Sequence, residues 1–499
     1  MKNLKQKVML FKHKISTLVC LLICILTVNP GYSNTQPEKY YVAIEFNKVL
    51  CGYSEITLSD SLVNGNKITV LRQEVHFDFS ALGRDMSQYQ KFTYHINPVT
   101  GNFIYHDSFL KQEGMERGGR AYVEEGKVRF TSFDSSDTDI FDLPENTILP
   151  NTQFFYHLRN DFVDQNLEHK VYSVFDMRTG ETTEMSYSKT GEEKVELANK
   201  IYDAVLFTES DAVTGVVTKI WIDKNTGLRL RMESPSQLTM YLADASVKEN
   251  IATGNWDDII LGKTNKYISS IQGISSMKVK VKLDAMPAPA LDDIQITGQI
   301  FTGDLDGISV DGIFEISHEQ YKGEDAPDFP VDDKKYADLN PYLEPSFYIE
   351  SDDPVLIEAA RDITEGSEDL WDAACRISHW IVDNINGSLL AGTARETYDN
   401  KSGLCAAQSM LMTALCRAAG IPSRVVWGCM YCHELGGSFG HHAWNEVFMG
   451  EAGWVPLDVT SHEADYVDSG HIRLGEVKTL QTIIDYDTME ILDFKSSGN

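Results

Sequence analysis

Three side chains in the last third of the chain, those of Cys405, His442 and Asp458, are of the types that cysteine acyl-transfer chemistry requires. Cys405 follows Gly403 and begins an expected helix, where the partial positive charge of the helix N-terminus favours thiolate over thiol. A thiolate is a nucleophile, an imidazole serves as its general base and acid, and a carboxylate orients the imidazole. A lone cysteine at a helix start is more often a small apolar filler, so the interpretation depends on the histidine and the aspartate.

A β-hairpin is expected to bring His442 and Asp458 together. Its strands are His442–Phe448 and Trp454–Asp458, joined by a turn of five residues. In this register Trp444 lies opposite Asp458 and His442 is the diagonal neighbour, with about 7–8 Å between the two backbone positions. A carboxylate near one ring nitrogen favours the imidazolium and leaves the other nitrogen free to meet the thiolate. The alternative is an ordinary amphipathic hairpin without chemistry.

Helices and strands are expected around these residues. Apolar side chains recur with a helical period in Val355–Ile363, Asp369–Ile385 and Cys405–Ala419. Gly420 and Pro422 end the last of these helices, because glycine suits a C-terminal cap and proline cannot continue a helix. The other expected segments are a polar loop at Arg395–Gly403, a strand at Arg424–Cys429 and a glycine-rich loop with Gly436, Gly437 and Gly440.

Three ordered sequence blocks carry a resemblance to a known family. They are GLCAAQSMLMTALCRAAGIPSRVVWG from Gly403, HAWNEVF from His442 and GWVPLDVT from Gly453. In this order, and in these helix and strand contexts, they resemble the transglutaminase-like superfamily of cysteine acyltransferases and hydrolases. The resemblance covers Asp353–Thr460, and it implies a papain-like α+β domain in the C-terminal part of the chain.

The resemblance also implies roles for individual residues. Cys405 corresponds to the nucleophile, His442 to the general base and acid, and Asp458 to the orienting carboxylate. The family usually has proline after the aspartate, whereas this chain has Val459, which alters the strand end but keeps the carboxylate. The implied activity is acyl transfer or amide and peptide hydrolysis through a thioester, on a protein or peptide substrate, with no cofactor and no metal. The alternative is a non-catalytic scaffold or interaction protein that retains the fold.

Cys429, Cys432 and His433 form a C-x-x-C-H pattern that allows three other interpretations. Haem attachment and a zinc site use such cysteines, but no second axial ligand and no remote pair of zinc ligands is evident. A disulfide requires the segment to turn, because in an extended strand the two Cα atoms lie about 10 Å apart. His441 is expected to point away from the face of His442 and to be a spectator.

The first half of the chain predicts an antiparallel sheet or open barrel and indicates little chemistry. Strand-like segments alternate with turns, and three hairpin candidates, Tyr94–His106, Val171–Tyr187 and Lys219–Met232, share a Thr-Gly turn in which glycine tolerates positive φ. The expected class is therefore a multidomain α+β protein. Its expected parts are a signal peptide (1–33), an antiparallel β-rich domain (34–250), a second small β module (251–321), an acidic proline-containing linker (322–345) and a transglutaminase-like domain (346–499).

Charge and the N-terminus limit the expected partners and location. The 499 residues include 44 Lys+Arg and 74 Asp+Glu, and the resulting net charge of −30 repels phosphate backbones, which argues against nucleic-acid binding. The basic segment Met1–Lys14 precedes an apolar run, Ile15–Val28, that is shorter than the about 20 residues of a membrane-spanning helix. We therefore expect a cleaved signal peptide and an exported protein, periplasmic, extracellular or at the cell surface. Membrane association is expected only through an uncleaved signal anchor.

Overall fold

The computed structural model divides into two compact units, residues 38–258 and residues 259–496. The signal peptide expected at 1–33 lies outside the described residues. Among the helices that the structure describes, none combines the length and the apolar character needed to cross a membrane. The structure describes all residues in these two ranges except residues 64, 82–83, 98–102, 113–114, 134–137, 150–156, 178–179, 212–216, 235–236, 270, 272–273, 318–319, 331–336, 389–391 and 478–481.

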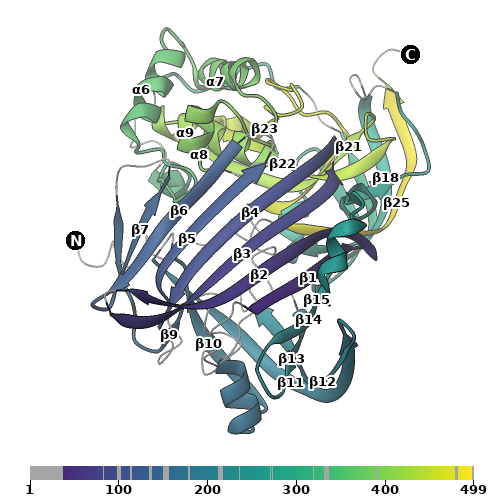
Figure 1. The fold of residues 1–499 in the computed structure, drawn as a ribbon. Helices are drawn as coiled ribbons and strands as arrows, with labels where there is room; N and C mark the ends of the chain where they lie inside the picture. The colour runs from purple at the N-terminus through teal and green to yellow at the C-terminus, as the bar shows by residue number, and fades with distance from the viewer. Residues whose placement is uncertain are drawn as a thin grey trace. The chain divides into compact units, whose positions relative to one another are not determined.

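The N-terminal unit is built on one large β-sheet (Figure 1). Its first strand, β1 (Glu38–Phe46), pairs antiparallel with both β2 (Val49–Val63) and β15 (Leu238–Ala243), so that two meanders meet at β1. Among the described pairings, the short ones of β9 with β10 and of β3 with β16 are parallel, and the others are antiparallel. The remaining strands are β3 (Asn66–Ala81), β4 (Arg84–Ile96), β5 (Phe103–Gln112), β6 (Met115–Glu124), β7 (Lys127–Ser132), β8 (Asp139–Asp142), β9 (Thr147–Ile148), β10 (His169–Phe175), β11 (Thr182–Leu197), β12 (Lys200–Asp211), β13 (Val217–Asp223), β14 (Arg229–Glu233) and β16 (Gly254–Asn255).

Local turn chemistry explains part of this sheet. Gly227, with φ +73°, follows Thr226 in the turn between β13 and β14. The carboxylate of Asp223 accepts hydrogen bonds from the backbone N–H and the hydroxyl of Thr226, which closes the turn. The turns of the other two hairpin candidates include residues outside the described part. The expectation of an antiparallel β-rich N-terminal part is confirmed.

The C-terminal unit combines two sheets with a group of helices. Its strands are β17 (Leu261–Lys263), β18 (Ile274–Met286), β19 (Gln299–Asp306), β20 (Ser309–Ile316), β21 (Ser423–Cys432), β22 (Ser438–Phe448), β23 (Trp454–Leu457), β24 (His471–Glu476) and β25 (Ile483–Ser496). Its helices are α5 (Leu291–Ile294), α6 (Pro354–Ile363), α7 (Leu370–Asn384), α8 (Ala394–Asn400) and α9 (Cys405–Ala418), and α4 (Asp257–Ile260) spans the boundary in the sequence. One sheet has the order β17-β22-β21-β24 with β23 added to β22, and the other has the order β19-β20-β18-β25. Helix α9 packs against β21 and β22 (Figure 1).

Residues 251–321 do not form a module of their own, in contrast to the expected division of the chain. Strand β18 pairs with β25, near the C-terminal end, and β17 pairs with β22. One apolar core joins the two sheets, and in it Val279 and Phe314 pack with Trp427 and Ile472. A sheet of β18–β20 alone would leave an apolar face and an open edge in water, and these distant strands cover both.

The acidic stretch 322–345 is not a free connector in its described part. Its prolines correctly predict irregular backbone, which includes a short 3₁₀ turn at Ala337–Tyr342. The side chains of Ala326 and Phe329 nevertheless pack against the core of the helices, and the backbone N–H of Phe329 donates to the carbonyl of Glu368 at 3.0 Å. A few apolar side chains therefore hold this segment against the core of the helices, although the segment carries many acidic residues.

The expected polar loop Arg395–Gly403 contains helix α8. The hydroxyl of Thr393 accepts from the backbone N–H of Glu396 at 3.2 Å, and the carboxylate of Glu396 accepts from the backbone N–H of Thr393 at 3.1 Å. This capping box starts a helix from local sequence alone, although the segment carries few apolar side chains. The glycine-rich loop is also shorter than expected, because Gly440 lies within β22.

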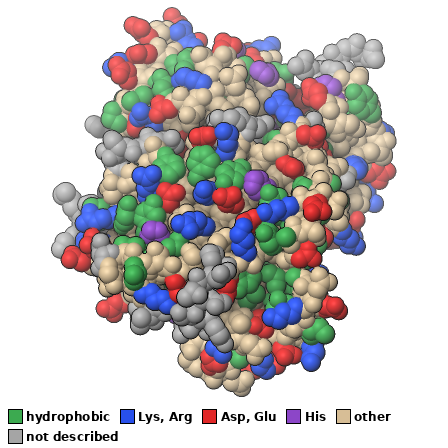
Figure 2. Space-filling view, viewed as in Figure 1, with side chains coloured by type: hydrophobic (Ala, Val, Ile, Leu, Met, Phe, Trp, Pro, Cys, Tyr) green, Lys and Arg blue, Asp and Glu red, His purple; other side chains and the backbone are tan. Residues whose placement is uncertain are grey.

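Side chains of both charges are interspersed on the face of the molecule drawn in Figure 2. Some form surface ion pairs, such as Lys278 with Glu315 at 2.6 Å. Exposed pairs of this kind contribute about 0–1 kcal/mol each, so the fold does not depend on them.

Candidate active site

Helix α9 presents Cys405 at its first residue. The preceding residue, Leu404, is the N-cap and has no side-chain acceptor, so its side chain accepts no hydrogen bond from the first backbone N–H groups of the helix. The amide of Gln408 donates to the carbonyl of Gly403 at 2.8 Å and holds the loop that enters the helix. The Cys405 side chain is half-buried rather than sealed in the core, and the positive end of the helix dipole acts on its sulfur.

Buried polar side chains fix α9 against β22. Nδ2 of Asn445 donates to the carbonyl of Ser409 and to the hydroxyl of Thr413, both at 2.9 Å. The hydroxyl of Ser409, in turn, donates to the carbonyl of Ala443 at 3.2 Å. Ser409 lies one helical turn after the cysteine, and Ala443 directly follows His442. These bonds therefore set the helix that carries the thiol relative to the strand that carries the imidazole.

The hairpin of β22 and β23 has the expected register. Asn445 pairs with Leu457, and Asp458 follows directly after β23. Nε2 of His442 lies 2.6 Å from Oδ2 of Asp458, with the two residues 5% and 0% exposed. The thiol of Cys405 interacts electrostatically with His442, which lowers the pKa of that thiol. The structure thus brings His442 and Asp458 together in the register that the hairpin predicts, and His442 acts on the pKa of the Cys405 thiol.

The charges of these groups favour a thiolate and an imidazolium. Burial by itself lowers the pKa of His442, but the charge of Asp458, the hydrogen bond to Asp458 and the interaction with Cys405 raise it to about 9. Burial opposes ionisation of Cys405, yet the interaction with His442 and its charge hold the pKa of the thiol below its ordinary value. Burial also acts against the Asp458 carboxylate, whose pKa the two neighbouring histidines, His442 and His471, hold well below its usual range.

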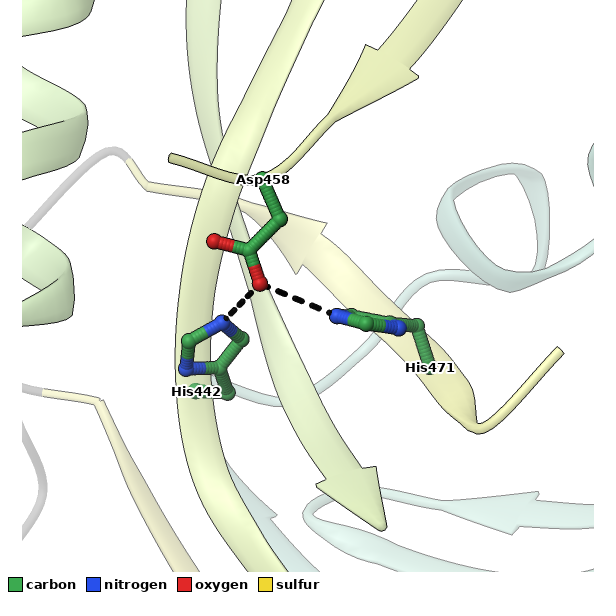
Figure 3. Close-up of side chains that lie close together, drawn as sticks. All are labelled: His442, Asp458 and His471. Atoms are coloured by element: carbon green, nitrogen blue, oxygen red, sulfur yellow. Dashed lines mark hydrogen bonds and ion pairs between the residues drawn. The ribbon is translucent and has the colours of Figure 1, made fainter. Parts of the chain in front are cut away.

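His471 and Ser461 also contact Asp458, and the sequence interpretation did not include them. Nε2 of His471 lies 3.2 Å from Oδ2 of Asp458 (Figure 3), and the hydroxyl of Ser461 donates to the same oxygen at 2.5 Å. Ser461 had a local signal, because a serine three residues after an aspartate commonly bonds back to it in a turn, and here the backbone N–H of Thr460 also donates to Oδ1. No local sequence pattern indicated His471, because this residue reaches the site only through the pairing of β24 with β21.

Two overlapping groups of buried side chains have the closeness that a metal site requires. They are His442, Asp458 and His471, and Glu463, Asp468 and His471, whose ligand atoms lie within 4.8 Å of one another in each group. Hydrogen bonds among the same groups account for this closeness, including one of 3.2 Å between Nδ1 of His471 and Oδ1 of Asp468. The described residues give no independent reason to assign a metal ion there.

The other sequence candidates lie apart from this group. Nε2 of His441 contacts the hydroxyl of Thr482 at 2.7 Å, on the opposite side of β22 from His442, as expected. Cys429 and Cys432 both have free thiols. They lie in the extended strand β21, where residues three apart point to opposite faces, so the turn that a disulfide between them requires is not formed.

Comparison with known proteins gives a family for the central part of this unit. Residues 357–459 match the model of the transglutaminase-like superfamily. Among solved structures, a candidate cysteine protease from Cytophaga hutchinsonii is similar at 17% identity, over 45% of this chain and 89% of that chain, with a TM-score of 0.32. A β-barrel-like protein of a domain of unknown function from Brucella abortus is similar at 11% identity, over 42% of this chain and 96% of that chain, with a TM-score of 0.30. A candidate protease from Parabacteroides distasonis is similar at 9% identity, over 75% of this chain and 64% of that chain, with a TM-score of 0.20.

No curated protein sequence gives a match to the chain. The class is therefore defined by the family model and the fold together: residues 357–459 are a transglutaminase-like superfamily domain, preceded by a large antiparallel β-sheet. The matched range includes Cys405, His442 and Asp458, whereas His471 lies beyond it.

Proposed function

We propose that the chain is a cysteine enzyme that transfers or hydrolyses acyl groups at amide bonds, with Cys405 as nucleophile, His442 as general acid and base, and Asp458 as the orienting carboxylate. The observation that carries the proposal is the position of His442. Nε2 of its ring lies 2.6 Å from Oδ2 of Asp458, and its charge lowers the pKa of the half-buried thiol of Cys405. A nucleophile, a base and an orienting group in line are the requirements of this chemistry.

Acylation of the cysteine is the first half of the proposed reaction. The Cys405 sulfur forms a bond to the amide carbonyl carbon, and the carbonyl π electrons move to oxygen. The backbone N–H of Cys405, at the start of α9, is the candidate donor to that oxyanion. When the oxyanion collapses, the C–N bond breaks, the amine leaves with the proton of His442, and a thioester remains.

Deacylation is the second half. Water or a second amine attacks the thioester carbonyl, His442 accepts the proton of the attacking group, and the C–S bond breaks to release the thiolate. Attack by water completes hydrolysis of a peptide bond or glutamine amide, and attack by an amine completes acyl transfer. We further propose a protein or peptide substrate and a location outside the cytoplasm, the latter from the signal sequence expected at 1–33.

Thiol labelling tests the proposal without knowledge of the substrate. Iodoacetamide near neutral pH is expected to modify Cys405 selectively and faster than a free cysteine, because its pKa is lowered. A Cys432→Ala control should label in the same way, since burial raises the pKa of Cys432 to about 12. Labelling of Cys405 at the rate of an ordinary thiol would favour the scaffold alternative.

Turnover tests the same assignment once a peptide library has given a substrate. Cys405→Ala is expected to lower kcat by about a thousandfold or more while folding is retained. His441→Ala, on the opposite face of the strand, should keep activity. Full turnover in Cys405→Ala would exclude the proposed nucleophile, and product analysis with and without an added amine distinguishes hydrolysis from transfer.

A further inference from the structure

A second histidine lies buried behind the carboxylate of Asp458. Both ring nitrogens of His471 face acids: Nε2 lies 3.2 Å from Oδ2 of Asp458, and Nδ1 lies 3.2 Å from Oδ1 of Asp468. A neutral imidazole can donate from only one nitrogen, so a ring that donates to a carboxylate on each side carries two protons and a positive charge. Its side chain is 0% exposed, so solvent does not screen this charge.

The other titratable groups near Asp458 and Asp468 carry no positive charge that could balance these two carboxylates. Burial raises the pKa of Tyr466, and of Cys432 on the neighbouring strand β21, to about 12, so both are neutral. Burial and the nearby Asp468 raise the pKa of Glu463 to about 8, which keeps this carboxyl largely protonated at neutral pH. His442 balances the thiolate of the site, which leaves His471 as the counter-charge of two carboxylates.

The backbone is shaped to admit this histidine. A Cβ atom at Gly428 would lie 1.9 Å from the carbonyl oxygen of Ile472, the residue after His471. Gly428 also pairs with His442 on the other side of β21, and the pairing of β21 with β24 shifts register at this point. The glycine thus allows β24 to approach, and the two imidazole rings lie 5.6 Å apart between centroids.

We propose that His471 is a positioning residue of the site, a buried imidazolium between Asp458 and Asp468 that fixes the Asp458 carboxylate and offsets part of its charge, so that His442 releases its proton more readily to a leaving amine. The inference rests on the proposed function, and it concerns a residue outside the matched family range. Asp458 alone would hold the proton of His442 too firmly for a general acid that works near neutral pH.

Two substitutions separate the charge of His471 from its hydrogen bonds. His471→Gln places an amide N–H where Nε2 lies and keeps a donor to Asp458, whereas His471→Asn places one near Nδ1 and keeps a donor to Asp468. Both remove the positive charge. The measurement is the rate of Cys405 alkylation by iodoacetamide from about pH 4 to about pH 11.5, in the full chain, in which the upper inflection reports loss of the proton from His442.

Both variants are expected to move the upper inflection to higher pH by about one unit, because a like charge near the His442 imidazolium has been removed. His471→Asn, which also frees the Asp458 carboxylate, is expected to lower the plateau rate by about tenfold relative to His471→Gln. An upper inflection that stays in place in both folded variants overturns the inference. Slow, unselective labelling of the wild-type protein would instead overturn the proposed function, so the two failures are distinguishable.

A measurement on the unaltered protein decides the matter if neither variant folds. In ¹⁵N spectra of protein labelled at histidine, one imidazole should stay doubly protonated as pH rises through the range in which exposed histidines lose their proton, and should still hold both protons where His442 loses its own, at about pH 9. The absence of any such signal overturns the inference.

Discussion

Nε2 of His442 lies 2.6 Å from Oδ2 of Asp458, and neither residue is more than 5% exposed. The two are 16 residues apart in the chain and meet because β22 and β23 pair in the register that a five-residue turn sets. A buried ion pair of this kind links the stability of the unit to the protonation of the imidazole.

Stability is expected to fall on the alkaline side of neutral pH. The folded-state pKa of His442 is about 9, above its ordinary value of 6.5, so its contribution is complete below pH 6.5 and is lost as pH rises through 9. The free energy of unfolding should decrease by about 3 kcal/mol across this range from this group. Urea unfolding followed by tryptophan fluorescence at a series of pH values measures the decrease. His442→Gln should flatten the dependence, and an unchanged slope in that variant would contradict the assignment.

Removal of the Asn445 side chain should damage both stability and reactivity. Asn445→Ala leaves the carbonyl of Ser409 and the hydroxyl of Thr413 without this donor in a fully buried position. We expect a loss of about 1–3 kcal/mol in the free energy of unfolding. Cys405 should also alkylate about tenfold more slowly, because α9 is no longer held against β22. The matched control is Asn384→Ala, an exposed asparagine near the end of α7, which should change neither quantity by much. Equal effects of the two substitutions would refute the role of Asn445.

A methyl group at Gly428 should displace β24. Gly428→Ala places a Cβ 1.9 Å from the carbonyl oxygen of Ile472, and backbone cannot yield as a flexible side chain would. The expected cost is about 1–3 kcal/mol, measured by urea unfolding, together with slower labelling of Cys405. Gly387→Ala is the control, because a Cβ there meets no atom within 4 Å. A wild-type stability for Gly428→Ala would show that the two strands can separate without loss.

Neutralising Glu446 should be far more costly than neutralising a surface acid. Its buried carboxylate bonds to Nε of Arg424 at 2.7 Å and to Nε of Arg473 at 2.9 Å. Glu446→Gln removes the nearest counter-charge of two largely buried guanidinium groups, which keep only the longer pairs of Arg424 with Glu476 at 3.8 Å and of Arg473 with Asp293 at 3.6 Å, and we expect a loss of about 3 kcal/mol. Glu315→Gln, which breaks an exposed pair with Lys278, should cost less than about 1 kcal/mol. Similar costs in thermal or urea unfolding would contradict this account.

The sequence by itself determined the local parts of this protein. Helical periodicity located α6, α7 and α9, and alternation with a five-residue turn gave the register that joins His442 to Asp458. These patterns are local, because the turn and the faces of a helix or strand depend on residues close in the chain. The same local reasoning missed α8, where the capping box at Thr393 starts a helix in a polar segment.

Only the tertiary structure decided the parts that depend on strands far apart in the chain. The pairing of β18 with β25 places residues 274–286 in the C-terminal unit, and the pairing of β21 with β24 carries His471 to Asp458. Partners of this kind are chosen by which apolar faces and open edges cover one another across a whole core, and no short stretch of sequence encodes that choice. The contact of the His442 imidazole with the Asp458 carboxylate was therefore predictable, and the contact of the second histidine with the same carboxylate was not.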